Sequence, residues 1–142
     1  MLAIDTEGFH LHIKPVSAQF EEPGGAYLEW IDVQITVTEP DIRAKGSWSV
    51  MPEELRQFRQ EIQIMQTGLQ PGQSARLASV ECGFDLTLRM LNRGAITGDW
   101  CFQPKPADGA RITGQCGLDQ TFLPEILRGI DALLSFCKSK RV

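Results

Sequence analysis

Hydrophobic and polar residues alternate along three segments in the first third of the chain. In residues 9–13 the apolar side chains fall on one side and two histidines on the other, and residues 27–38 alternate over a longer stretch. Residues 42–50 alternate again, with Ile42 and every second residue after it on the apolar side. A period of two is typical of half-buried strands. The pattern therefore predicts three strands, with a hairpin formed by 27–38 and 42–50 and a Pro-Gly-Gly loop over 19–26.

The period changes to three or four residues over 51–68, which predicts an amphipathic helix. Its apolar residues are Leu55, Phe58, Ile62 and Met65, and Leu69 continues the period just after it. Pro52 falls in the first turn, where a backbone N–H needs no partner, and two glutamates follow it at the positive end of the helix dipole. Gly68 is a natural end for this helix.

Alternation returns in the second half of the chain. Residues 74–92 divide into two predicted strands, and residues 95–104 and 110–118 each form one more. The connections between them are short and contain Asn-Arg-Gly or Pro-Ala-Asp-Gly, which are turn-forming residues. Strands at this spacing with short turns indicate an antiparallel meander.

A broad apolar stripe at helical spacing ends the chain, from Phe122 to Cys137. With Thr121 as N-cap, Pro124 falls in the first turn of this second helix. Gly129 lies inside the helix, where it costs about 1 kcal/mol relative to alanine. We expect this glycine to allow the helix to approach the sheet closely.

The order of elements predicts an α+β fold in a single domain over residues 1–142. Runs of strands with segregated helices favour this class over a parallel βαβ fold. We expect one antiparallel sheet of about seven strands, a bent or two-layered meander. One helix follows the third strand and the other is C-terminal.

Charge and composition limit the classes of partner. The net charge is −4 and the sequence pI is about 5.2, which disfavours a general nucleic-acid binder but suits a basic protein partner. The chain has no long apolar run and no signal-peptide pattern at its start, so we expect a cytoplasmic protein that does not bind membranes. The four cysteines are far apart and are predicted to be free thiols, with Cys116 and Cys137 buried on apolar faces.

Chemical motifs are few. The sequence has no nucleophile elbow, P-loop or dinucleotide fingerprint, so no catalytic residues and no cofactor are predicted. His10 and His12 share one face of a predicted strand and could bind a metal if an Asp or Glu supplied a third ligand. The favoured interpretation is a solvated polar face with no metal. A metal- or ligand-binding β domain, or a hydrolase built on the two histidines and a carboxylate, remains as an alternative.

A partner surface is predicted on and beside the 27–38 strand. Trp30 lies on its polar side, and an exposed tryptophan can anchor a protein interface, although burial beneath a helix or loop is also open. Carboxylates flank it along the strand and in the following turn. The predicted partner-binding residues are Glu29, Trp30, Asp32, Glu39 and Asp41.

Five segments together resemble the WapI-like bacterial immunity proteins. They are YLEWIDVQITV, GSWSVMPEELRQF, ASVECGFDLTLRM, GAITGDWCF and LDQTFLPEILRGIDALL. The resemblance spans about residues 8 to 136, and its motifs are structural rather than catalytic. It implies a non-enzymatic protein that binds and neutralises a cognate toxin, such as a nuclease. The acidic charge of the chain is compatible with a basic toxin.

Overall fold

The computed structural model describes residues 1–21, 28–105 and 107–140, and this part of the chain contains two antiparallel four-stranded sheets. The first sheet has the order β1-β2-β3-β4, and the second has the order β5-β6-β7-β8. The strands are β1 (Leu2–Thr6), β2 (Phe9–Glu21), β3 (Leu28–Glu39), β4 (Ile42–Val50), β5 (Ser74–Ala78), β6 (Phe84–Met90), β7 (Ala95–Phe102) and β8 (Ile112–Asp119).

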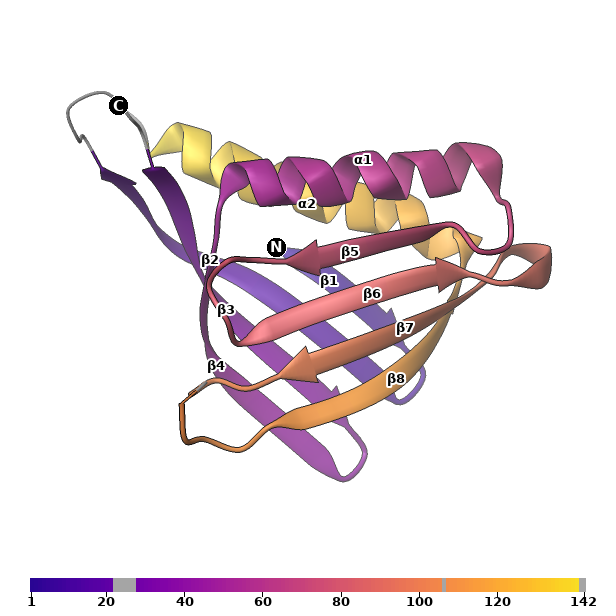
Figure 1. Cartoon of the computed structure of the whole chain (residues 1–142), viewed down its shortest axis with the longest axis horizontal. Coiled ribbons are helices and arrows are strands. Elements are labelled where there is room, and N and C mark those ends of the chain that lie inside the picture. The colour runs from indigo at the N-terminus through magenta and orange to yellow at the C-terminus, as the bar shows by residue number, and fades with distance from the viewer. Residues whose placement is uncertain (22–27, 106, 141–142) are drawn as a thin grey trace.

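Two helices close one side of the space between the sheets. Helix α1 (Pro52–Gly68) connects the sheets, and α2 (Leu123–Ser139) follows β8 after a short 3₁₀ turn at Gln120–Phe122; another such turn, Asn92–Gly94, precedes β7. Helix α1 packs against β5, α2 packs against β1, and the helices contact each other. Because β1 and β5 are edge strands, the helix pair bridges one edge of each sheet, with the helices side by side above the sheets in Figure 1.

The hydrophobic core lies between the inward faces of the sheets and beneath the helices. The four apolar residues predicted for the first helix are completely buried, and Trp48 and Trp100 are each only 3% exposed, as the alternation predicts. Phe84 packs edge-to-face against Trp48 and Phe102, with ring centroids 5.3 and 6.0 Å away. This aromatic cluster joins the first sheet to the second, so the core is continuous across the two layers.

The α+β class, the antiparallel pairing and the two helices are confirmed, but the sheet arrangement is not. There are two four-stranded sheets instead of one sheet of about seven strands, and α1 follows the fourth strand instead of the third. The missed strand is β1, which pairs with β2 through a tight turn containing Gly8 at φ +87°. Its inward residues Leu2 and Ile4 are buried, and their alternation is too short to stand out in a sequence.

Strand β2 is longer than its predicted 9–13 range. Its pairing with β3 continues to Glu21, with a register shift between Pro15 and Ser17. A bulge adds one residue to a strand and reverses which side chains face the core, so the period-two pattern changes phase there. Pro15 and this phase change concealed the second half of the strand. The 19–21 part of the predicted loop is therefore strand, and the 22–26 part lies outside the described residues.

Smaller differences concern element ends. Ile42 is 44% exposed, since it stands at the turn end of β4 beyond the cover of the second sheet. Leu69, at φ 50°, takes the left-handed position after α1 and donates its N–H to the Met65 carbonyl, so Gly68 is the last helical residue. Helix α2 begins at Leu123, and Thr121 is not its N-cap, because Asp119 caps an intervening 3₁₀ turn through the Thr121 N–H.

The start of α1 is anchored by one glutamate. Glu54 Oε1 accepts hydrogen bonds from the Met51 N–H and the Ser79 hydroxyl, both at 2.8 Å, and its Oε2 accepts from the Val80 N–H at 2.8 Å. These bonds satisfy a free donor at the helix start and tie the helix to the segment after β5. Glu54 thereby fixes the angle at which α1 leaves the first sheet and returns to the second.

Candidate functional site

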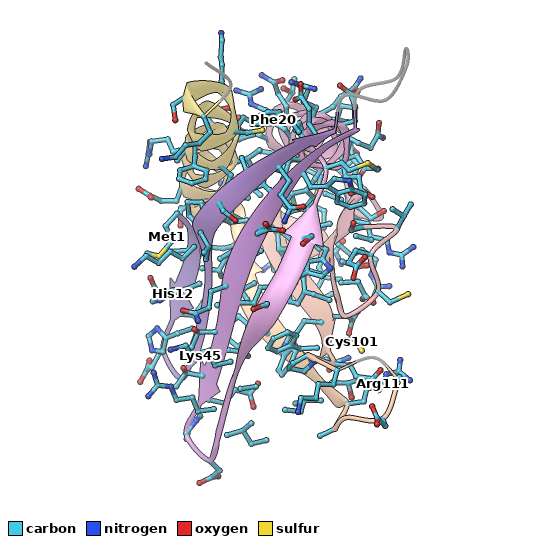
Figure 2. All side chains as sticks on the ribbon, turned by 90° about the vertical axis from the view of Figure 1, so that its left-hand side faces the viewer. Met1, His12, Phe20, Lys45, Cys101 and Arg111 are labelled. Carbon is cyan, nitrogen blue, oxygen red and sulfur yellow. The ribbon has the colours of Figure 1, made fainter. Side chains whose placement is uncertain are left out.

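The outer face of the first sheet is lined mostly by polar side chains. We use this name for the side chains of β1–β4 that point away from the core, between the buried positions of each strand. They are Asp5, His10, His12, Lys14, Ser17, Gln19, Trp30, Asp32, Gln34, Thr36, Thr38, Arg43, Lys45, Ser47 and Ser49. The face carries both charge signs. In Figure 2, His12 and Lys45 lie on this side, and Cys101 and Arg111 lie on the opposite side of the molecule.

Asp32 is fixed at the centre of a hydrogen-bond network on this face. Its Oδ2 accepts from the Ser17 hydroxyl and the Gln19 amide, each at 2.8 Å, and its Oδ1 accepts from the Ser49 hydroxyl at 2.7 Å. The three donors come from β2 and β4, the two strands that flank β3. Because the carboxylate is held from both sides, its position is determined before any partner arrives.

Trp30 lies on the same face and is half-buried. It stands opposite Gln19 in the β2–β3 register, one outward position from Asp32. The side chain is therefore neither a core residue nor fully exposed. Such a half-covered aromatic ring beside a fixed carboxylate can contribute both apolar area and a hydrogen-bond acceptor to an interface.

Glu29 lies on the opposite side of β3 from Trp30 and Asp32, because successive residues of a strand alternate between its two faces. It lines a cleft of about 370 Å³ between the two helices and the beginning of β3. The cleft also contains Arg56, Asp131 and Lys138, so charges of both signs surround Glu29. The helices beside the cleft are joined by Arg59, which donates to both carboxylate oxygens of Asp131 at 2.7 and 3.2 Å.

Glu39 and Asp41 lie at the other end of β3, next to the turn into β4. Asp41 is exposed and Glu39 is half-buried. The ten-residue step from Glu29 to Glu39 corresponds to about 33 Å along a strand. The structure thus brings Trp30 and Asp32 together and places Glu29 and the Glu39–Asp41 pair at opposite ends of the same strand. Their role in partner binding stays a prediction.

A second group on the outer face unites β1 and β2. Asp5 is directly opposite His10 in the register, and His12 lies two residues further along β2 on the same face. Asp5 Oδ1 is 2.7 Å from both His10 Nδ1 and His12 Nε2. The carboxylate that the H-x-H pattern required is therefore present, and the fold supplies it from the strand next to the histidines.

The two histidines lower the pKa of Asp5. Partial desolvation raises the pKa of Asp5, but the hydrogen bonds and the charges of His10 and His12 outweigh this effect and hold the pKa below its ordinary value. The carboxylate is accordingly ionised at neutral pH. The sequence did not identify Asp5 as the third residue of this group because strand β1, which carries it, was not predicted. The signal that could have found it is the alternation of residues 2–6 before a Glu-Gly turn.

The cysteines behave as the sequence predicts. All four are reduced thiols, Cys116 and Cys137 are buried, and Cys82 is exposed. Desolvation raises the pKa of Cys116 to about 11, and the negative charges of Asp99 and Glu39 act in the same direction. The thiolate is the reactive form, so Cys116 is a packing residue.

We expect iodoacetamide at about pH 8 to alkylate Cys82 and to leave Cys116 unmodified in the folded protein. With a pKa near 11, about one Cys116 thiol in a thousand is ionised at that pH, and the side chain is only 8% exposed. Peptide mass spectrometry after timed labelling measures both sites, and denatured protein provides the control in which both react. Equal labelling of Cys116 and Cys82 in the folded state would contradict this assignment.

The fold and this polar sheet face define an α+β protein whose candidate site is the outer face of an antiparallel sheet. A comparison with protein-family models matches residues 1–136 to the immunity protein WapI-like family. The chain belongs to this family, and the resemblance found in the sequence is confirmed. No match is found among curated proteins. Within the described residues, neither helix is long and apolar enough to cross a membrane.

Proposed function

We propose that this chain is a non-enzymatic immunity protein that binds a cognate bacterial toxin in the cytoplasm and neutralises it. The observation that carries the proposal is family membership over residues 1–136, which includes both sheets and nearly all of α2. The match covers almost the whole described fold and not a short motif. Toxin binding is thus proposed as a property of the folded surface.

The proposed partner surface follows β3 and contains Glu29, Trp30, Asp32, Glu39 and Asp41. A standard protein interface buries about 800 Å² on each partner, which corresponds to a patch about 32 Å across. This is close to the distance between the two ends of β3. Trp30 and Asp32 share the outer face, whereas Glu29 lines the cleft on the other side of the strand, so a toxin that contacts the whole set must also reach around the beginning of β3. Trp30 and the fixed Asp32 would lie within the patch, with the flanking carboxylates near its ends.

Electrostatics favours a basic toxin, though the carboxylates are not alone on this surface. The net charge of −4 supports attraction at long range. Lys14 and Lys45 stand beside the middle of β3, and Arg43 pairs with Thr38 next to Glu39, so a uniformly basic partner would meet repulsion on this face. We therefore propose a toxin with basic residues opposite the carboxylates of the set and neutral or acidic residues opposite Lys14, Arg43 and Lys45.

The first experiment is affinity capture from a lysate of the source organism, at low and at moderate salt, followed by mass spectrometry. Each retained protein is then expressed alone and together with this chain. We expect one retained protein to arrest growth when expressed alone, and growth to return on co-expression. If no captured protein is toxic, or if co-expression fails to restore growth, the proposed function is wrong.

Charge reversal tests the surface separately. We expect Glu39→Lys with Asp41→Lys to weaken affinity for the captured toxin by about tenfold or more, which corresponds to about 1.4 kcal/mol. Trp30→Ala with Asp32→Asn is expected to do the same toward the Glu29 end of the patch. Isothermal titration calorimetry measures both effects.

The matched control reverses the same number of charges elsewhere. Glu53 and Glu125 lie in the first turns of α1 and α2, and each forms an exposed ion pair with an arginine three residues later. Glu53→Lys with Glu125→Lys should leave the affinity within about twofold of the unmodified chain, because neither glutamate belongs to the proposed set. The exposed ion pairs that these changes break contribute little to stability, so the fold should be kept. A loss as large as that of the β3 variants would mean that net charge, and not this surface, determines binding.

A further inference from the structure

The cluster of Asp5, His10 and His12 combines three potential metal ligands in one place. Within the described ranges, these residues form the one group of three His, Cys, Asp or Glu side chains whose ligand atoms all lie within 4.8 Å of one another. Two imidazoles and one carboxylate form a ligand set found in zinc and non-haem iron proteins. From this geometry we propose that the three side chains bind a divalent transition-metal ion, with Zn²⁺ as the test ion.

The strand register provides the geometry. Asp5 and His10 are directly paired, and His12 follows at the next outward position of β2. Side chains two residues apart on a strand share a face, and a cross-strand neighbour lies within reach of both. The imidazole rings are 6.4 Å apart and inclined at 70°, so that one nitrogen of each ring is directed at the same carboxylate oxygen.

The present distances require only a small expansion to accommodate an ion. A tetrahedral Zn²⁺ with bonds of about 2.0–2.1 Å separates its ligand atoms by about 3.3 Å. Asp5 Oδ1 is 2.7 Å from each histidine nitrogen, so each of these pairs must move apart by about 0.6 Å to reach the tetrahedral separation. The side chains are 40–51% exposed, and solvent therefore reaches the cluster and can complete the coordination.

Proton positions are compatible with either state. Without an ion, a hydrogen on each facing nitrogen donates to the Asp5 carboxylate, which can only accept. With an ion, each imidazole carries its hydrogen on the other ring nitrogen and directs a lone pair at the metal. This exchange needs no change in backbone structure. The ion would then join β1 to β2 near the turn that connects them.

The test is a titration of the full, tag-free chain with Zn²⁺ against a fluorescent chelator. We expect one ion per chain, and we expect His10→Gln, His12→Gln and Asp5→Asn each to weaken binding roughly tenfold or more, since even residues that only orient ligands affect affinity this much. Mg²⁺ should not compete, because it prefers oxygen ligands. Thermal unfolding supplies a second measurement: Zn²⁺ should raise the melting temperature of the unmodified chain but not of the histidine variants.

Two controls separate this site from other zinc ligands and from general damage. Cys82→Ser removes the exposed thiol, and Thr36→Ala changes the β3 residue opposite His12; both should retain the affinity of the unmodified chain. The proposal is overturned if the unmodified chain binds no Zn²⁺ at about 100 μM, a low affinity by the usual scale. It is equally overturned if Cys82→Ser abolishes binding while the histidine variants retain it. This site is independent of the proposed immunity function, and either can fail without the other.

Discussion

Replacing Trp48 by alanine is expected to lower the free energy of unfolding by about 3–5 kcal/mol. The indole is 3% exposed, packs edge-to-face on Phe84, and donates its Nε1–H to the Glu81 carbonyl at 2.9 Å. Truncation leaves a cavity where the two sheets meet and removes a hydrogen bond that ties β4 to the segment before β6. Urea unfolding followed by circular dichroism measures the change.

Two further variants separate the contributions of this residue. Trp48→Phe keeps an aromatic ring near Phe84 but loses the hydrogen bond to Glu81, and should cost about 1–3 kcal/mol. Trp30→Ala makes the same truncation on the outer face, where the side chain is half-buried, and should cost about 1 kcal/mol. If the alanine variants at 30 and 48 were equally destabilised, the aromatic cluster would not be a main connection between the sheets.

Gly129→Val is expected to destabilise the protein by about 3 kcal/mol, although valine is a better helix former than glycine. A Cβ at position 129 would lie 2.7 Å from Leu2 Cα and 3.1 Å from the Met1 carbonyl oxygen. These are backbone atoms, so they cannot move aside without displacing β1 from α2. Gly129→Ala should show a smaller loss of about 1–2 kcal/mol, measured in the same way.

Gly117→Ala is the matched control for this series. A Cβ at position 117 would have no heavy atom within 4 Å outside its immediate chain neighbours, so alanine there should leave stability unchanged or raise it by up to about 1 kcal/mol. Should Gly129→Ala stabilise the protein as Gly117→Ala does, the close contact between α2 and β1 would be wrong.

Local patterns predicted most elements of this fold, and the misses have physical causes. Long alternating or helical stretches such as β3, α1 and α2 have a strong period, and their buried positions agree with it. The close approach at Gly129 was expected from a glycine inside a helix. Strand β1 offered only five residues, and the bulge after Pro15 reversed the phase of β2. The division into two sheets depends on packing between segments that are distant in sequence, and the hydrophobic period of a single segment cannot predict such packing.

The candidate sites show the same division between local and long-range information. His10 and His12 are visible as an H-x-H pair on one strand, yet Asp5 belongs to the strand that the pattern missed. Asp32 could be placed on a polar face, but its three hydrogen-bond donors come from two neighbouring strands. Glu29 and Glu39 were grouped because they are near in sequence, whereas the extended strand sets them far apart.

The contact of α2 with β1 has a consequence for how the chain is made. Strand β1 leaves the ribosome long before α2, so the apolar residues Leu2 and Ile4 remain uncovered on one side until α2 has been made. Contacts between such distant segments slow folding, and exposed strand edges promote association between chains. The β1–β2 hairpin should therefore be the part of the nascent chain that most needs protection by chaperones. A chain released from a stalled ribosome before α2 is made would expose Leu2 and Ile4 and would aggregate most readily.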